Sequence, residues 1–147
     1  MDQKKVLANI RKLFDTQKQG VLATIGTPYP YTSLMTFAAT PDLKQVVFAT
    51  LRKTKKYVNM KANDHVSLLV DSALNRVEDV KNAVAVTMLG AATEADATTQ
   101  KEFRTMLLKK NPELAGFLNE TECAVMVLRV DLYIYVDSFQ HVIEIAM

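Results

Sequence analysis

The sequence predicts a single α+β domain over residues 1–147, in which six or seven antiparallel strands form a barrel with helices at its periphery. Apolar runs of strand length follow one another with glycine- or proline-containing turns between them. Helical periodicity is confined to three separate stretches, so strands and helices do not alternate as they do in a doubly wound sheet. With 147 residues, 49% of them hydrophobic, the chain can bury one core.

The first third of the chain predicts a helix followed by three strands. Residues 3–17 place apolar side chains at helical spacing opposite lysines and Arg11. Residues 21–25 and 31–39 predict two hairpin-paired strands, and a further turn leads to a strand over 45–50. Three strands are therefore expected in close succession.

The rest of the chain predicts two helical regions and up to four further strands, and we expect all strands to follow in meander order. Pro112 can begin a helix but cannot continue one, so it divides the second helical region. Gly90 suggests a bulge or bend in the longest strand. The predicted elements are a short helix over 54–62, strands over 65–71 and 82–95, helical segments within 97–118, and strands over 124–136 and 142–145.

A basic stretch at the junction of a strand and a helix predicts an anion site. Between Asp42 and Asp64 there is no carboxylate but there are six cations, whereas the whole chain carries only +2 and the remainder therefore sums to −4. Thr54 stands where a helix N-cap belongs, and free N–H groups at a helix start favour phosphate. The alternative is a solvated basic loop. The six cations are Lys44, Arg52, Lys53, Lys55, Lys56 and Lys61.

This stretch resembles the phosphate-binding segment of the FMN-binding split-barrel family typified by pyridoxamine 5′-phosphate oxidase. The matching residues are Phe48, Thr50, the run Thr54-Lys55-Lys56, and Asn63. Residues 30–37 resemble the family strand that runs along the flavin ring, and residues 83–94 resemble its long strand with a mid-strand glycine. Together the matches cover about residues 19–95.

The resemblance implies an FMN cofactor and its binding residues. It implies the flavin ring along Ser33, Leu34, Met35 and Thr36, and the phosphate at Thr54, Lys55 and Lys56 with Thr50 and Arg52 close by. It also implies a homodimer with flavin at the interface and therefore a contribution from the partner chain. Asn75 and Arg76, polar residues in the connection before the long strand, are the candidates for it, and a mobile solvated loop is the alternative. No side chain is assigned a catalytic role. Without the resemblance, ordinary barrel packing explains the strand residues.

Two departures from the namesake oxidase argue against pyridoxamine phosphate as the substrate. A glutamine that the family places on the long strand is Ala85 here, and His141 has no arginine two residues before it. The resemblance therefore implies an FMN-dependent oxidoreductase with an unidentified small-molecule electron donor or acceptor. Alternatives are a non-catalytic flavin carrier or sensor, or a relative that binds deazaflavin or haem. Nucleic-acid binding is disfavoured because there is no second basic stripe.

Composition restricts the location and the remaining chemistry. We expect a cytoplasmic protein without a membrane span, because no apolar run is long enough and the N-terminus is amphipathic. Cys123 lies in an apolar run, where burial is the expected role. His65 and His141 are too few and too far apart to predict a metal site.

Overall fold

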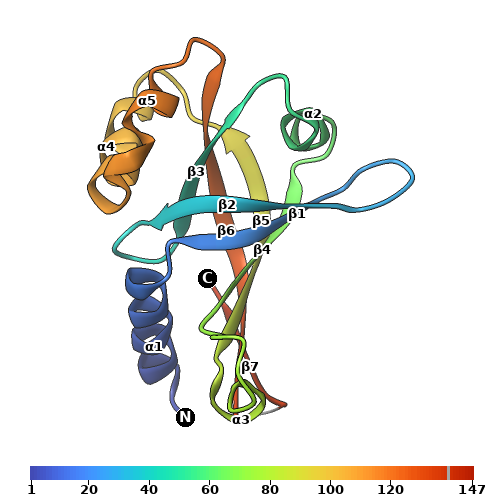
Figure 1. Ribbon diagram of the computed structural model, residues 1–147, viewed down its shortest axis with the longest axis vertical. Helices are drawn as coiled ribbons and strands as arrows, with labels where there is room; N and C mark the ends of the chain where they lie inside the picture. The colour runs from blue at the N-terminus through green and yellow to red at the C-terminus, as the bar shows by residue number, and fades with distance from the viewer. Residues whose placement is uncertain (139) are drawn as a thin grey trace.

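The computed structural model describes residues 1–138 and 140–147, in which seven strands are accompanied by short helices (Figure 1). The strands are β1 (Gln19–Thr24), β2 (Tyr31–Ala39), β3 (Gln45–Leu51), β4 (His65–Asp71), β5 (Ala85–Glu94), β6 (Cys123–Asp137) and β7 (His141–Ala146). The helices are α1 (Gln3–Thr16), α2 (Lys55–Ala62), α3 (Asp79–Asn82), α4 (Gln100–Lys110), the 3-10 turn η1 (Pro112–Leu114) and α5 (Ala115–Leu118). Only α3 was not expected from the sequence.

Six of the strands close into an antiparallel barrel. The strand order is β3-β2-β1-β4-β5-β6-β7, and an additional pairing of β3 with β6 closes the barrel and leaves β7 outside it. The predicted split barrel with peripheral helices is thereby confirmed.

The predicted meander order is wrong at one connection. After β3 and α2 the chain does not pair with β3 again; β4 pairs instead with β1, with Val21 opposite Leu69. The physical reason is that β6 occupies the second edge of β3, from Gln45 opposite Arg129 to Leu51 opposite Cys123. The free edge of β1 is therefore the one that β4 extends.

Helix α1 closes one end of the barrel (Figure 1). Asp2 caps it by accepting a hydrogen bond from the N–H of Lys5 at 2.9 Å. One face, with Ile10 and Phe14 almost fully buried, joins the main core cluster inside the barrel. Phe14 meets Phe37 of β2 edge to face, with ring centroids 5.4 Å apart, so the helix is packed against the strand that borders the pocket described below.

Helices α4 and α5 cover part of the outside of the barrel. Phe103, Leu107 and Leu118 bury against the outward side chains of β2, β3 and β6 in a second apolar cluster. Cys123 belongs to this cluster and is buried, as predicted. Pro112 begins η1, which confirms that the second helical region is divided there.

Gly90 marks the irregularity predicted in the long strand. The register of β5 against β6 shifts between Leu89 and Gly90. A Cβ at Gly90 would lie 1.9 Å from the carbonyl oxygen of Arg129, so no larger residue fits without a backbone shift. The glycine permits the close strand approach that curves the barrel.

Candidate functional site

The site lies where β2 and β3 separate. These strands pair only at Phe37–Ala39 against Val46–Phe48 and then diverge, β3 continuing toward α2 (Figure 1). β3 still pairs with β6 and β2 still pairs with β1 beyond that point, so each strand keeps one edge facing the split. The split is therefore lined by backbone as well as by side chains.

A pocket of about 270 Å³ occupies this split. It brings together residues from β2, from the end of β3, from the start of α2 and from the segment after α4. The lining residues are Leu34, Met35, Thr36, Ala49, Thr50, Leu51, Thr54, Lys56, Leu114 and Phe117. Six of the residues predicted from the sequence (Leu34, Met35, Thr36, Thr50, Thr54 and Lys56) therefore meet in one cavity.

Thr54 is the N-cap of α2, as predicted. Its hydroxyl oxygen accepts from the N–H of Tyr57 at 3.4 Å. Helix geometry leaves the N–H groups of Lys55 and Lys56 without an intrahelical acceptor, and they add to the positive end of the helix dipole. This end of α2, together with the Lys56 side chain, supplies the positive charge of the pocket.

Arg52 is held by an acidic partner rather than lining the pocket. Its guanidinium forms an ion pair with Glu94 of β5 at 2.8 Å, and the Tyr57 hydroxyl donates to the same carboxylate at 2.7 Å. The hydrogen bond from Arg52 lowers the pKa of Glu94, and the same contact raises the pKa of Arg52. This cluster ties the β3–α2 turn to β5.

Two further contacts fix α2 over the end of the barrel. The Asn59 side chain donates to the hydroxyl of the buried Thr24 at 3.0 Å. The Lys55 ammonium lies 5.2 Å from the centre of the Tyr31 ring and does not line the pocket. Successive helix residues point about 100° apart, so adjacent Lys55 and Lys56 serve different purposes.

The remaining predicted residues lie away from the pocket. Ser33 stands opposite Leu22 and so shares the inward face of β2; within the described residues its buried hydroxyl has no hydrogen-bond partner. Asn75 and Arg76 lie in the β4–β5 connection next to α3, at the opposite end of the barrel from α2 (Figure 1). Within one chain the structure therefore does not bring Asn75 and Arg76 to the predicted site.

Leu114 and Phe117 are pocket residues that sequence reasoning did not select. Both are half-buried beside α4 and line the cavity opposite β2. In the sequence they read as the apolar face of a helical segment. Only the way that η1 and α5 fold back on β3 and β6 places them at the pocket, so no local signal could have found them.

The comparisons with known proteins bear on this geometry. The family model described as pyridoxamine 5′-phosphate oxidase matches residues 6–126. The chain belongs to this family. The match begins inside α1, includes the pocket strands and α2, and ends inside β6. No protein of curated function matches the sequence.

Solved structures with low sequence identity share this family fold. A haem-binding protein from Mycobacterium smegmatis has a TM-score of 0.86 at 16% identity, over 99% of this chain and 60% of that one. General Stress Protein 26 from Bacillus anthracis has a TM-score of 0.72 at 22% identity, with both chains fully covered. A FAD-binding protein from Mesorhizobium loti has a TM-score of 0.69 at 16% identity, over 86% and 89% of the two chains. This chain thus spans about three fifths of the mycobacterial protein.

No helix in the part of the chain that the structure describes has the length and apolar character needed to cross a bilayer.

Proposed function

We propose that this member of the family binds FMN in the β2–β3 pocket, with the phosphate at the start of α2 and the flavin ring along β2. The observation that carries the proposal is the single pocket that joins a positively charged helix start to the unpaired edge of a strand. The donors fit the two ends of FMN, since one end is an anion and the other a flat ring with hydrogen-bonding groups.

Positive charge and unpaired backbone donors support the proposed position of the FMN phosphate. Lys56 lines the pocket next to Thr54, and the N–H groups of Lys55 and Lys56 have no acceptor inside the helix. Such groups at a helix N-terminus bind phosphate, and a lysine ammonium strengthens the interaction. Arg52 contributes indirectly, because its pair with Glu94 holds the turn in place.

The direction of the backbone groups of β2 supports the proposed position of the flavin ring. The N–H of Phe37 donates to the carbonyl oxygen of Lys18, and the N–H of Thr40 donates to the carbonyl oxygen of Gln45. The backbone N–H and C=O groups of odd-numbered β2 residues therefore point toward β1, and those of even-numbered residues point toward β3. Because hydrogen bonding alternates along an antiparallel strand, the backbone groups of Leu34 and Thr36 point into the split. They can bond the pyrimidine edge of a flavin while the 64% exposed Leu34 side chain meets the ring.

A second copy of the chain would complete the site. The pocket is slightly smaller than the roughly 300–1,000 Å³ of typical small-molecule sites, so one chain would enclose only part of FMN. The outer face of the sheet supports dimerisation. A row of mostly apolar outward side chains crosses five strands, formed by Leu34, Val21, Leu69, Thr87 and Ile134.

The β4–β5 connection suits the partner's share of the site. Asn75 and Arg76 cannot reach the pocket of their own chain, but the loop that carries them is well ordered by Asp79, whose carboxylate accepts from the N–H groups of Leu74 and Arg76. Val77 beside them is 89% exposed, so its apolar side chain is available for burial. Burial against a second copy would add favourable apolar contact.

Bound FMN would supply hydride or electron transfer, and the protein would supply binding, orientation and shielding from water. Leu114 and Phe117 would exclude water from one side of the pocket. The function we propose is therefore an FMN-dependent oxidoreductase acting on a small molecule. A non-catalytic flavin carrier would share the same site. Turnover of a reduced nicotinamide with an electron acceptor, in the FMN-loaded protein, separates the two.

The test compares FMN with riboflavin, which lacks the phosphate. We expect the purified protein to show the two-banded flavin spectrum and to bind FMN at least about tenfold more tightly than riboflavin, the worth of a charged hydrogen bond. Lys56→Met should remove most of that preference. The matched control, Lys53→Met, changes an exposed lysine outside the pocket and should retain it. A protein that binds neither flavin would overturn the proposal.

Haem is the second candidate, favoured by the likeness to a haem-binding structure. His65 lines a separate pocket of about 420 Å³ with Gly90 and Asp131, and its imidazole is an exposed potential iron ligand. A Soret band after haem addition that His65→Ala abolishes, together with no flavin binding, would establish this alternative.

A further inference from the structure

Another pocket, of about 400 Å³, lies between α1, α4 and the end of β2. Phe37 of β2 stands between this pocket and the β2–β3 pocket. Cations dominate its charged groups. Arg11, Lys109 and Lys110 line it with a single carboxylate, that of Asp15, which leaves two positive charges without a counter-ion in the lining. The remaining lining residues are Phe14, Ala38, Ala39, Pro41 and Met106.

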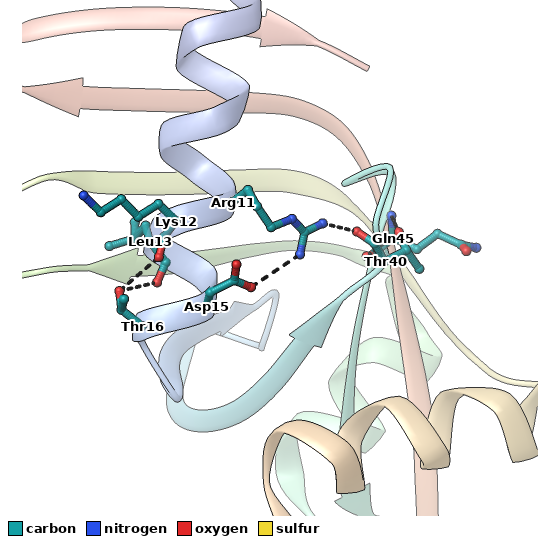
Figure 2. Close-up of polar contacts among 7 residues, drawn as sticks. All are labelled: Arg11, Lys12, Leu13, Asp15, Thr16, Thr40 and Gln45. Atoms are coloured by element: carbon teal, nitrogen blue, oxygen red, sulfur yellow. Dashed lines mark hydrogen bonds and ion pairs between the residues drawn. The ribbon is translucent and has the colours of Figure 1, made fainter.

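Arg11 is fixed at the edge of this pocket. Figure 2 shows its guanidinium between the Asp15 carboxylate on the same helix and the carbonyl oxygen of Thr40 in the β2–β3 turn. The Arg11–Asp15 distance is 3.8 Å. Arg11 therefore engages Asp15, and among the described residues no ion pair joins Asp15 to Lys110.

Lys110 is a buried cation without a partner. Its ammonium nitrogen is covered from solvent, and no hydrogen-bond acceptor reaches it within residues 1–138 and 140–147. It lies 3.7 Å from the centre of the Phe37 ring, a cation–π contact that offsets part of the desolvation. Burial lowers the pKa of Lys110 to about 8. An anion placed beside it would supply the missing partner.

We propose that this pocket binds a small carboxylate with an apolar body, whose apolar part lies on Phe14, Ala38 and Met106. Its carboxylate pairs with Lys110 when that side chain turns from the Phe37 ring toward the cavity. The charge of the lining selects an anion. The apolar residues beside the cations favour a short aliphatic chain over a fully hydrated inorganic anion, because part of its surface leaves water on binding.

The site and the β2–β3 pocket share strand β2. Asn111, which follows α4, is fully buried and donates to the carbonyl oxygen of Phe37 at 3.3 Å. Thr36, which precedes Phe37, lines the β2–β3 pocket, and Ala38, which follows Phe37, lines the pocket between α1 and α4. The proposal itself does not depend on flavin, so it can be tested on the protein without FMN.

Amide chemical shifts of the labelled protein would locate and measure binding of hexanoate, with uncharged hexanamide as the matched ligand. We expect saturable shifts at Arg11, Ala38 and Lys109, and hexanamide affinity at least about tenfold lower, the worth of one charged hydrogen bond. The hexanamide comparison needs no variant. Lys110→Met should weaken hexanoate binding by a similar factor, whereas Lys101→Met, an exposed lysine on the same helix outside the pocket, should not.

Three results would overturn the proposal: no saturable shifts with hexanoate at millimolar concentration, shifts centred on the start of α2 instead, or equal affinities for hexanoate and hexanamide.

Discussion

The hydroxyl oxygens of Thr50 and Thr54 lie 2.9 Å apart, although Thr50 is near the end of β3 and Thr54 caps α2. Thr54 donates to the carbonyl oxygen of Leu51 at 2.8 Å, so the proton between the two hydroxyls comes from Thr50. Both hydroxyl protons are thus used to shape the turn. The donors left for an anion are the N–H groups at the helix start and the Lys56 ammonium.

Thr54→Ala should therefore weaken both the fold and phosphate binding. Loss of an N-cap costs about 1 kcal/mol of unfolding free energy, and Thr50 loses its acceptor as well. Urea denaturation measures the first effect and FMN titration the second. Thr54→Ser keeps the capping oxygen and should behave nearly as wild type. Equal stability of the alanine and serine variants would show that the cap is unimportant.

Gly90→Ala should be far more destabilising than a second glycine replacement. A Cβ at Gly90 meets the Arg129 carbonyl oxygen at 1.9 Å, whereas a Cβ at Gly116 has nothing within 4 Å. We expect a loss of roughly 2–4 kcal/mol for Gly90→Ala, as for severe overpacking. Gly116→Ala in helix α5 should be neutral or stabilising by up to about 1 kcal/mol. Thermal unfolding of both variants provides the comparison, and similar melting temperatures would contradict it.

Local chemistry made much of the fold predictable. The spacing of apolar residues in α1, the cap at Thr54, the break at Pro112 and the irregularity at Gly90 depend on neighbours in the sequence, and the structure confirms each. The pairing of β4 with β1 depends on which strand edges remain free after the chain has folded. No local pattern records that choice.

The candidate site likewise combines features set by neighbouring residues in the sequence with features set by tertiary packing. Thr54 and Lys56 are found from a strand-to-helix junction, but Lys55 has the same charge and points elsewhere because of the helical turn. The sequence predicts Arg52 near a phosphate, whereas in the structure Arg52 pairs with Glu94, which lies 42 positions further along the chain. Leu114 and Phe117 reach the pocket only through the packing of α5 on the barrel.

Glu94→Gln should lower stability in a pH-dependent way. The hydrogen bond from Arg52 is the main cause of the lowered pKa of Glu94. The contribution of a carboxyl with a lowered folded pKa is present above its unfolded pKa of about 4.3 and is lost as the pH falls through the folded value. We expect a deficit of about 0.5–1 kcal/mol at pH 7, since the pair is partly exposed.

The measurement is urea denaturation at pH 7 and at pH 3, with Glu120→Gln as an exposed control. At pH 3 the deficit of Glu94→Gln should be much reduced. A deficit of the same size at both pH values would show that the carboxylate charge does not contribute.

Leu69→Glu should dissociate the proposed homodimer. Leu69 is 37% exposed in the single chain and stands between Val21 and Thr87 on the outer sheet face. Burying an unpaired carboxylate there costs several kcal/mol, which corresponds to at least about a hundredfold weaker association. Sedimentation velocity of the variant and of Thr105→Glu, on the exposed side of α4, tests this. A monomeric wild type at micromolar concentration would refute the dimer.

Lys110→Met should change how stability depends on pH. The charged groups that act on this ammonium are Asp15, which raises its pKa, and Lys18 and Arg11, which lower it, but burial is the largest effect and lowers the pKa to about 8. Between pH 8 and the unfolded value of about 10.4, the unfolded chain therefore binds more protons than the folded one, and stability rises with pH.

Below pH 8 both states are protonated and the folded state bears the full desolvation of the ammonium. We therefore expect Lys110→Met to exceed wild type in unfolding free energy at pH 7, and this advantage to shrink by about 1–2 kcal/mol by pH 10.5, a figure discounted for partial solvent screening. Urea denaturation at the two pH values measures the difference. Lys101→Met, which replaces an exposed lysine, should have the same unfolding free energy as wild type at both pH values. If the excess unfolding free energy of Lys110→Met were the same at both pH values, Lys110 would titrate as an ordinary surface lysine.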